Sequence, residues 1–265
     1  MTSRPDDTLR VAGLVLKWVR GNRPLNLARI EPMIREAAER GAQLAVTTEC
    51  FLDGYAVRDK SIPLDAYFAM GEPLPDGPYF RRLAELAREL EIHLAIGVHE
   101  VSGVIHYNTA ALIDPDGQLV GRYHKHRLGH EVDRHAPAPQ GHFPVFPTRL
   151  GTLGMMICAD RARIHIAGGL ADNGADLILC LSGGSFGPEK NDPGLRERSR
   201  ETGRHIVFVP PAEFLVTGPD GRNIDVRLFG DPAERGAALL VSEDEIGSAR
   251  DDHCVCLVDL PQASQ

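Results

Sequence analysis

The chain has 265 residues, of which 43% are hydrophobic and 25% charged, as expected for a globular protein with a sizeable core. Its formal charge of −8, from 29 basic and 37 acidic residues, and its lack of any Lys/Arg run argue against a nucleic-acid partner. No stretch approaches the roughly 18 apolar residues of a membrane span, and the polar start does not resemble a targeting signal. We therefore expect no membrane association and a cytoplasmic location.

Apolar runs typical of short buried strands alternate along the chain with segments of helical periodicity. The expected strands are residues 10–19, 42–50, 93–101, 107–115, 118–123, 152–158, 176–182, 205–211, 237–243 and 254–260. The expected helices are residues 25–41, 78–91, 161–173 and 194–204. This alternation predicts helices that cover the faces of a sheet.

The segment Asp114-Pro-Asp-Gly117 reads as a hairpin turn that joins two of these strands, so a mixed sheet is favoured over a purely parallel one. The Pro-rich piece at 135–147 is interpreted as a surface loop before a strand. Because no repeat, low-complexity stretch or long linker interrupts the pattern, we expect a single α/β domain over residues 1–265.

The five cysteines form an odd, sparse set that does not resemble the disulfide framework of a small secreted protein. Cys254 and Cys256 stand two apart in a strand-like run, which points both side chains to one face. No second cysteine pair accompanies them as a zinc site would require, so we expect both to be packing residues.

Three residues share a setting that favours chemistry. Cys158 ends an apolar strand immediately before a helical segment, a turn that exposes a nucleophile and favours its thiolate. Glu49 ends another strand, where partial burial would make it a useful base. Lys125 follows a third strand and could stabilise a developing oxyanion. Each residue alone would fit a structural role, and their joint setting is what suggests an active site.

These residues carry a resemblance to the nitrilase, or carbon–nitrogen hydrolase, superfamily over nearly the whole chain. The family pattern has a Glu after the second strand, a Lys in Y-x-K-x-x-L, and a Cys in G-x-x-I-C-x-D before a helix that ends in G-A-D. The corresponding segments are Thr47-Thr-Glu49, Tyr123-His-Lys125-His-Arg-Leu128, Gly154-Met-Met-Ile-Cys158-Ala-Asp160 and Gly174-Ala-Asp176.

The resemblance implies an αββα sandwich of mixed β-sheets flanked by helices, completed to four layers by dimerisation. It also implies hydrolysis of a non-peptide C–N bond in a small amide-type substrate, without metal or cofactor. Glu49 would be the base, Cys158 the nucleophile that forms a thioester, and Lys125 with the Ala159 N–H the oxyanion partners, while Glu131 matches a second family glutamate. The expected substrate-binding residues are Tyr55, Ala159, Arg161, Gly183 and Phe186.

The chain departs from the family pattern after the nucleophile. Ile164, His165 and Gly168 replace the usual Pro, Glu and Arg, so a Glu–Arg contact behind the turn is missing or rebuilt with Arg161 or Arg163. Carbamoylase-like members hold a substrate carboxylate with two adjacent arginines, of which only Arg161 is matched here. The sequence therefore leaves open whether the substrate is acidic.

Several alternatives accompany this interpretation. The thioester would also allow acyl transfer to an amine, and the altered segment 161–168 leaves room for a catalytically silent binding protein. The histidines at 124, 126, 130, 135 and 142 do not follow a known metal-ligand spacing. The segment 183–190 lacks the phosphate-loop pattern and reads as a turn in the pocket wall. The apolar strands at 205–211 and 254–260 would need covering on their outer side, which predicts a homodimer or larger oligomer.

Overall fold

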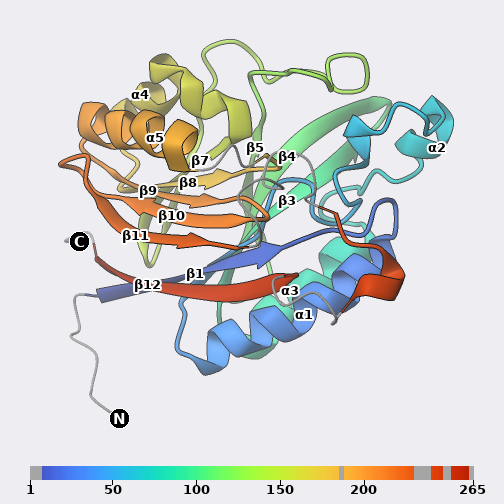
Figure 1. The fold of residues 1–265 in the computed structure, drawn as a ribbon, viewed down its shortest axis with the longest axis horizontal. Helices are drawn as coiled ribbons and strands as arrows, with labels where there is room; N and C mark the ends of the chain where they lie inside the picture. The colour runs from blue at the N-terminus through green and yellow to red at the C-terminus, as the bar shows by residue number, and fades with distance from the viewer. Residues whose placement is uncertain (1–7, 185–187, 230–239, 247–251, 263–265) are drawn as a thin grey trace.

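Two six-stranded β-sheets pack face to face between two pairs of helices in the computed structural model (Figure 1). The structure describes residues 8–184, 188–229, 240–246 and 252–262. Both sheets are mixed, because three neighbouring parallel strands in each are flanked by antiparallel ones. The carboxyl ends of parallel strands are where α/β sheets position ligand-binding side chains.

The first sheet has the strand order β12-β1-β2-β3-β4-β5. Its strands are β1 (Thr8–Leu16), β2 (Leu44–Val46), β3 (His93–Ser102), β4 (Ile105–Ile113), β5 (Leu119–His124) and β12 (His253–Pro261). Its outer face is covered by α1 (Arg23–Glu39) and α3 (Pro78–Leu90), whose buried side chains form one apolar cluster with the sheet. In α3 the buried positions Phe80, Leu83, Leu86 and Ala87 have the spacing of a single helical face.

The second sheet has the strand order β11-β10-β9-β8-β7-β6. Its strands are β6 (Val145–Thr148), β7 (Gly151–Ile157), β8 (Leu177–Leu181), β9 (His205–Val209), β10 (Glu213–Thr217) and β11 (Asn223–Leu228). Two helices, α4 (Ile164–Asp172) and α5 (Pro188–Thr202), cover its outer face (Figure 1). The strands of both sheets contribute to the apolar core between them.

Four short helices complete the described chain: the 3-10 turns η1 (Ala56–Arg58), η2 (Cys158–Ala162) and η3 (Glu243–Glu245), and α2 (Leu64–Phe68). None of the helices in the described part of the chain is long and apolar enough to cross a membrane.

This architecture confirms the expected αββα arrangement of mixed sheets and helices. All four layers are present in one chain, and dimerisation stays a prediction. The outer side of β9 is covered by the chain's own α5, which removes the reason given for placing a partner there. The hairpin turn at 114–117 is also confirmed, since the Asp114 carboxylate accepts hydrogen bonds from the backbone N–H groups of Asp116 and Gln118.

Some expected elements are wrong. In the segment 237–243, Leu240 forms only an isolated bridge to Trp18, and η3 begins at Glu243; residues 237–239 lie outside the described part. The helix expected at 194–204 begins at Pro188, so it includes the end of the segment interpreted as a turn. The strands that the sequence analysis missed are β6, β10 and β11.

Candidate active site

The predicted catalytic residues meet beyond the carboxyl ends of strands from both sheets. Glu49 follows β2, Lys125 follows β5, and Cys158 follows β7. Lys125 and Cys158 line one cavity of about 670 Å³, together with Glu131. The other described residues of its wall are Tyr55, Arg58, Arg127, Leu128, Gly129, His130, Ala159, Arg161, Ala162, Gly183, Gly184, Asn191 and Gly194.

Glu49 is fully buried and joins the two sheets. The strand β2 ends at Val46, so Glu49 lies in the segment beyond it rather than at the strand end that we expected. Its backbone N–H donates to the carbonyl oxygen of Ser182, at 3.3 Å. Its Oε1 accepts hydrogen bonds from Lys125 Nζ and Asn108 Nδ2, both at 2.7 Å. Glu49 is thus held by groups from both sheets, through its carboxylate and its backbone N–H.

The Lys125 ammonium lies between two carboxylates. Its Nζ donates to Glu49 Oε1 and to Glu131 Oε1, and its side chain is 2% exposed. Burial alone would lower the pKa of Lys125, but the charges of Glu49 and Glu131 raise that pKa well above its ordinary range. Lys125 therefore remains a cation, as an oxyanion partner must be.

Cys158 sits at a strained turn between β7 and η2. Its φ of 47° lies in the left-handed region, which is uncommon for a residue with a side chain. The buried Asp160 carboxylate holds this turn by accepting from the Ile157 N–H at 3.2 Å, the Tyr123 hydroxyl at 2.8 Å and the Arg127 N–H at 2.7 Å. The thiol consequently faces the cavity at a fixed position, as a nucleophile does.

Arg161 lines the cavity and also binds the turn that carries Cys158. Its Nη1 donates to the Cys158 carbonyl oxygen at 2.7 Å and lies 3.7 Å from Cys158 Sγ, and its Nη2 donates to Asn191 at 3.1 Å. Arg163 and His165 are exposed. Of the two arginines considered as replacements for the missing family contact, it is Arg161 that contacts the nucleophile turn.

Tyr55 and Gly183 also line the cavity. Tyr55 is buried with φ 55° and stacks on Trp18 with ring centroids 5.4 Å apart. The Gly183 N–H donates to Glu49 Oε2 at 2.5 Å, and a Cβ at Gly183 would lie only 2.8 Å from that oxygen. Ala159 also lines the cavity, whereas Phe186 lies outside the described residues.

Residues 10–224 match the carbon–nitrogen hydrolase family. The chain belongs to this family. The N-carbamoylputrescine amidase of Solanum lycopersicum is 28% identical over 177 residues, which cover 65% of this chain and 57% of that protein. The chain therefore spans less than two thirds of the length of this curated relative. The match confirms the expected family, whereas the extent of the domain over residues 1–265 stays a prediction.

Solved structures show that this member of the family has the nitrilase fold. Nit3 of Saccharomyces cerevisiae, a member of branch 10 of the nitrilase superfamily, superposes with a TM-score of 0.77 at 20% identity, over 96% of this chain and 90% of that one. A variant of the amidase from Nesterenkonia sp. AN1 superposes with a TM-score of 0.75 at 22% identity, over 97% of this chain and 92% of that one. That structure shows the acetamide moiety of fluoroacetamide added at the active-site cysteine.

The sequence analysis missed the supporting roles of two residues of this candidate site. Asn108 is buried in β4, where its Nδ2 binds Glu49 and its Oδ1 accepts from Cys50 Sγ at 3.4 Å. Asp160 was noticed only as part of a motif. The signal for Asn108 was available, because an amide within an apolar strand must find partners when it is buried.

Cys254 and Cys256 and three histidines of the dense segment contact other side chains in the described structure. Cys254 and Cys256 share one face with their Sγ atoms 3.9 Å apart, as predicted, and both pack against the core between the sheets. The histidines of the dense segment diverge: His124 contacts Glu100, His126 contacts Tyr123, and His135 contacts Tyr67. Over residues 8–184, 188–229, 240–246 and 252–262, no group of three potential ligands could hold a metal ion.

Proposed function

We propose that this chain hydrolyses the C–N bond of a small linear amide or carbamoyl amide through a thioester on Cys158. The observation that carries the proposal is the convergence of a strained, cavity-facing thiol with a buried Glu49–Lys125–Glu131 cluster. A nucleophile and a fixed cation that line the cavity, with a carboxylate base bound directly behind that cation, are the groups that acyl transfer requires.

The proposed reaction begins when Glu49 accepts the thiol proton and Cys158 Sγ adds to the substrate carbonyl carbon. The Lys125 ammonium and the Ala159 N–H stabilise the oxyanion of the tetrahedral intermediate. As this intermediate collapses, the C–N bond breaks and the nitrogen leaves with the proton from Glu49. Water, deprotonated by Glu49, then adds to the thioester, and the acid leaves as the thiol is restored.

The positions of the remaining groups support this division of roles. Burial would raise the pKa of Glu131, but Lys125 holds that pKa below its ordinary range, so Glu131 stays a carboxylate that fixes the ammonium. The amidase activity named for the Solanum protein, and the nucleophilic active-site cysteine of the Nesterenkonia amidase, to which the acetamide moiety of fluoroacetamide adds, are consistent with the proposed chemistry.

The test is mass-spectrometric detection of an acyl group on Cys158 while amides, carbamoyl amides and nitriles are screened. Peptide mapping is needed because Cys254 is half-buried and hydrogen-bonded to Cys256, which lowers the pKa of Cys254 to about 7. Cys50, Cys180 and Cys256 are buried. We expect the acyl group on the peptide that contains Cys158.

Four variants separate catalytic from structural roles. Cys158→Ala should abolish turnover, and Lys125→Met should lower it on the order of 10²–10³-fold or more. Glu49→Gln should impair both acylation and hydrolysis. The control Cys254→Ala should lower only stability, by about 1 kcal/mol. If activity in all four fell only in step with melting temperature, the proposed roles would be wrong.

A further inference from the structure

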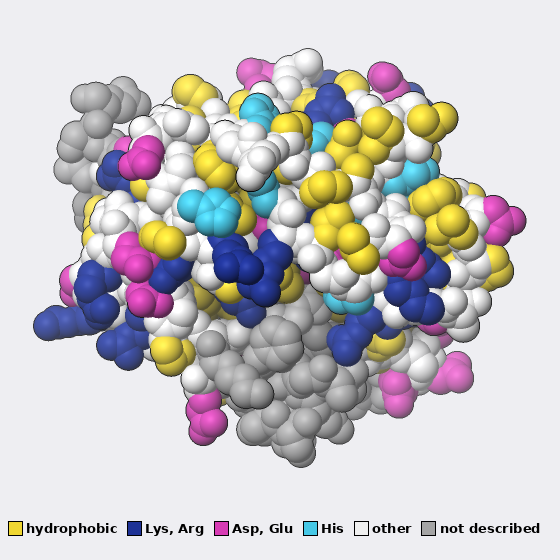
Figure 2. Space-filling view, turned by 90° about the horizontal axis from the view of Figure 1, so that it is seen from above, with side chains coloured by type: hydrophobic (Ala, Val, Ile, Leu, Met, Phe, Trp, Pro, Cys, Tyr) yellow, Lys and Arg dark blue, Asp and Glu magenta, His cyan; other side chains and the backbone are white. Residues whose placement is uncertain are grey.

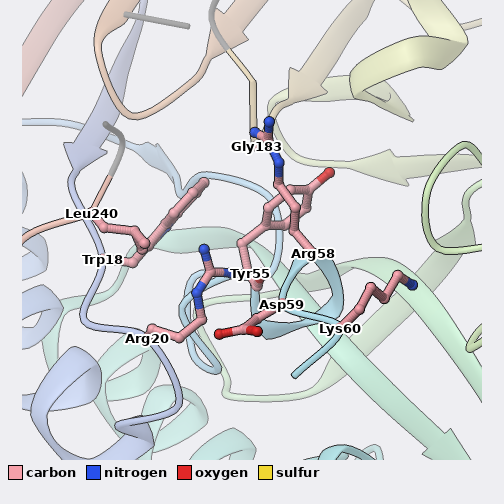
Figure 3. Close-up of a pocket in the computed structure, with 8 residues that line it drawn as sticks. All are labelled: Trp18, Arg20, Tyr55, Arg58, Asp59, Lys60, Gly183 and Leu240. Atoms are coloured by element: carbon pink, nitrogen blue, oxygen red, sulfur yellow. Dashed lines mark hydrogen bonds between the residues drawn. The ribbon is translucent and has the colours of Figure 1, made fainter. Parts of the chain in front are cut away.

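A second pocket opens beside the catalytic cavity and shares part of its wall. It has a volume of about 390 Å³ and is formed by Trp18, Arg20, Tyr55, Arg58, Asp59, Lys60, Gly183 and Leu240 (Figure 3). Tyr55, Arg58 and Gly183 also line the catalytic cavity. A substrate bound at Cys158 can therefore extend toward this pocket along the wall that the two share.

The charges around the two pockets are predominantly positive. The basic residues that line them are Arg20, Arg58, Lys60, Lys125, Arg127 and Arg161, and the acidic ones are Asp59 and Glu131. On the face drawn in Figure 2, Lys and Arg side chains gather near the centre beside His side chains and again at the left and right, and Asp and Glu stand mainly toward the rim. Most of the pocket cations already have anionic or carbonyl partners. Lys60 pairs with Asp133 at 2.6 Å, Lys125 lies between Glu49 and Glu131, and Arg20 donates to the Tyr55 carbonyl.

Two guanidinium groups differ from these. Within the described residues, the side chains of Arg58 and Arg127 have no hydrogen bond or ion pair, although both line the catalytic cavity. The neighbouring Asp59 carboxylate accepts two hydrogen bonds from Ser61. In Figure 3 the Arg58 side chain extends toward Gly183, whereas Lys60 extends away from the other labelled residues. Arg58 is thus the unpaired cation that both pockets share.

We propose that Arg58 binds a carboxylate at the end of the substrate remote from the scissile bond. The preferred substrates are then linear amides or carbamoyl amides that carry a terminal carboxylate. This inference rests on the proposed function and adds the substrate class. It assigns the anion to Arg58 rather than to Arg161, because Arg161 is engaged with the Cys158 carbonyl and Asn191.

Hydrogen bonds hold the backbone that leads to Arg58. Arg58 is the last residue of η1, which follows the left-handed Tyr55. The Tyr55 N–H donates to the Cys50 carbonyl and to Asp53 Oδ1, each at 3.0 Å. The planar guanidinium matches a carboxylate geometrically, and charge-assisted hydrogen bonds of this kind are strong. By the same electrostatics, Arg58 and Arg127 would repel an ammonium such as the one that ends N-carbamoylputrescine.

The test compares substrates of one length with three different ends. The amide series is glutaramate, its isostere with an isopropyl group in place of the carboxylate, and its amine-terminated analogue. The carbamoyl series includes N-carbamoyl-γ-aminobutyrate and N-carbamoylputrescine. In the unmodified protein, we expect kcat/KM to be highest for the carboxylate compounds. Arg58→Gln should lower kcat/KM for the carboxylate compounds about 10- to 100-fold, and it should change kcat/KM for the isopropyl amide about twofold or less.

Further variants and a binding measurement make the outcome decisive. For the carboxylate substrates, the kcat/KM of Arg58→Lys should lie between that of the unmodified protein and that of Arg58→Gln. Arg222→Gln is the control, because it removes an arginine that is 83% exposed in the turn between β10 and β11 and should change nothing. In a Cys158→Ala background, glutaramate should raise the melting temperature, and adding Arg58→Gln should remove that shift.

The failures of the two proposals are distinguishable. The carboxylate site would be overturned if Arg58→Gln lowered kcat/KM equally for all substrates, or if the unmodified protein preferred uncharged or amine-terminated amides. Either result would leave the proposed hydrolysis intact. Absence of an acyl group on Cys158 with every compound would overturn the proposed hydrolysis. The binding shift in Cys158→Ala would then still decide whether Arg58 holds a carboxylate.

Discussion

At the scale of single residues, two buried carboxylates near the active site have opposite electrostatic surroundings. Glu131 binds the Lys125 ammonium, which holds the pKa of Glu131 below its ordinary range against the effect of burial. Asp53 is 1% exposed, and burial raises its pKa from 3.8 to about 7. Its Oδ2 has no hydrogen-bond partner in the described structure, and His99 Nδ1, likewise unpartnered, lies 3.8 Å away. Pairing with a cation, rather than burial itself, separates the two cases.

The raised pKa of Asp53 predicts a pH-dependent effect on stability. Between about pH 4 and pH 7 the folded state binds more protons than the unfolded state, so stability falls as the pH rises through this window. Asp53→Asn removes this loss and keeps an oxygen for the Tyr55 N–H. We expect the variant to exceed the parent in stability by a few kcal/mol at about pH 8, and by much less at about pH 4.

Thermal unfolding of the parent and variant at both pH values checks this expectation. Asp116→Asn is the control, because Asp116 is exposed in the turn between β4 and β5. A stability difference for Asp53→Asn that is the same at both pH values would show that the buried carboxyl does not titrate in this window.

At the scale of elements, close backbone contacts position Glu49, the proposed catalytic base. A Cβ at Gly97, in β3, would lie 2.4 Å from the Thr48 carbonyl oxygen and 2.8 Å from Glu49 Cα. Gly97→Ala should therefore displace the segment that carries Glu49 and cost about 1–3 kcal/mol of stability. Because a base must be held within a fraction of an ångström, we expect turnover and Cys158 alkylation to slow by about tenfold or more in the folded variant.

The matched control for Gly97→Ala is Gly168→Ala in α4. A Cβ at Gly168 meets nothing within 4 Å, so this variant should be neutral or slightly stabilising and keep full activity. Circular dichroism and melting temperature establish that each variant is folded. A folded Gly97→Ala protein with normal Cys158 reactivity would contradict the positioning role of this contact.

The strands and helices with strong periodicity were predictable, and the irregular segments between them were not. The missed hairpin of β10 and β11 did carry a signal, since Gly218-Pro-Asp-Gly221 resembles the hairpin turn that was recognised at 114–117. Motif order indicated Glu49, Lys125 and Cys158. The sequence could not show that Arg58 has no hydrogen bond or ion pair among the described residues, because this depends on which charges the fold brings near it.

At the scale of the whole molecule, the site lies where the two sheets meet, so its geometry depends on their packing. Glu49 and Lys125 come from the first sheet, and Cys158 and Gly183 from the second. The hydrogen bonds of Glu49 to Gly183 and of Tyr123 to Asp160 cross between the sheets. A change in how the sheets pack should therefore alter the distance between Glu49 and Cys158, even without a substitution in the cavity.

The edge of the second sheet offers a surface for the predicted homodimer. Ile224, Val226 and Leu228 project from one face of β11 and are 46%, 39% and 40% exposed. An edge strand with an exposed apolar row is prone to pair with another chain.

We propose that this row contributes to self-association, so light scattering at micromolar concentration should give a mass above the 28.9 kDa of one chain. Val226→Glu should lower that mass, whereas Val104→Glu, at a residue 93% exposed between β3 and β4, should not. A monomeric parent protein would refute self-association. If Val226→Glu left the mass unchanged, the interface would have to lie on another face than that of β11.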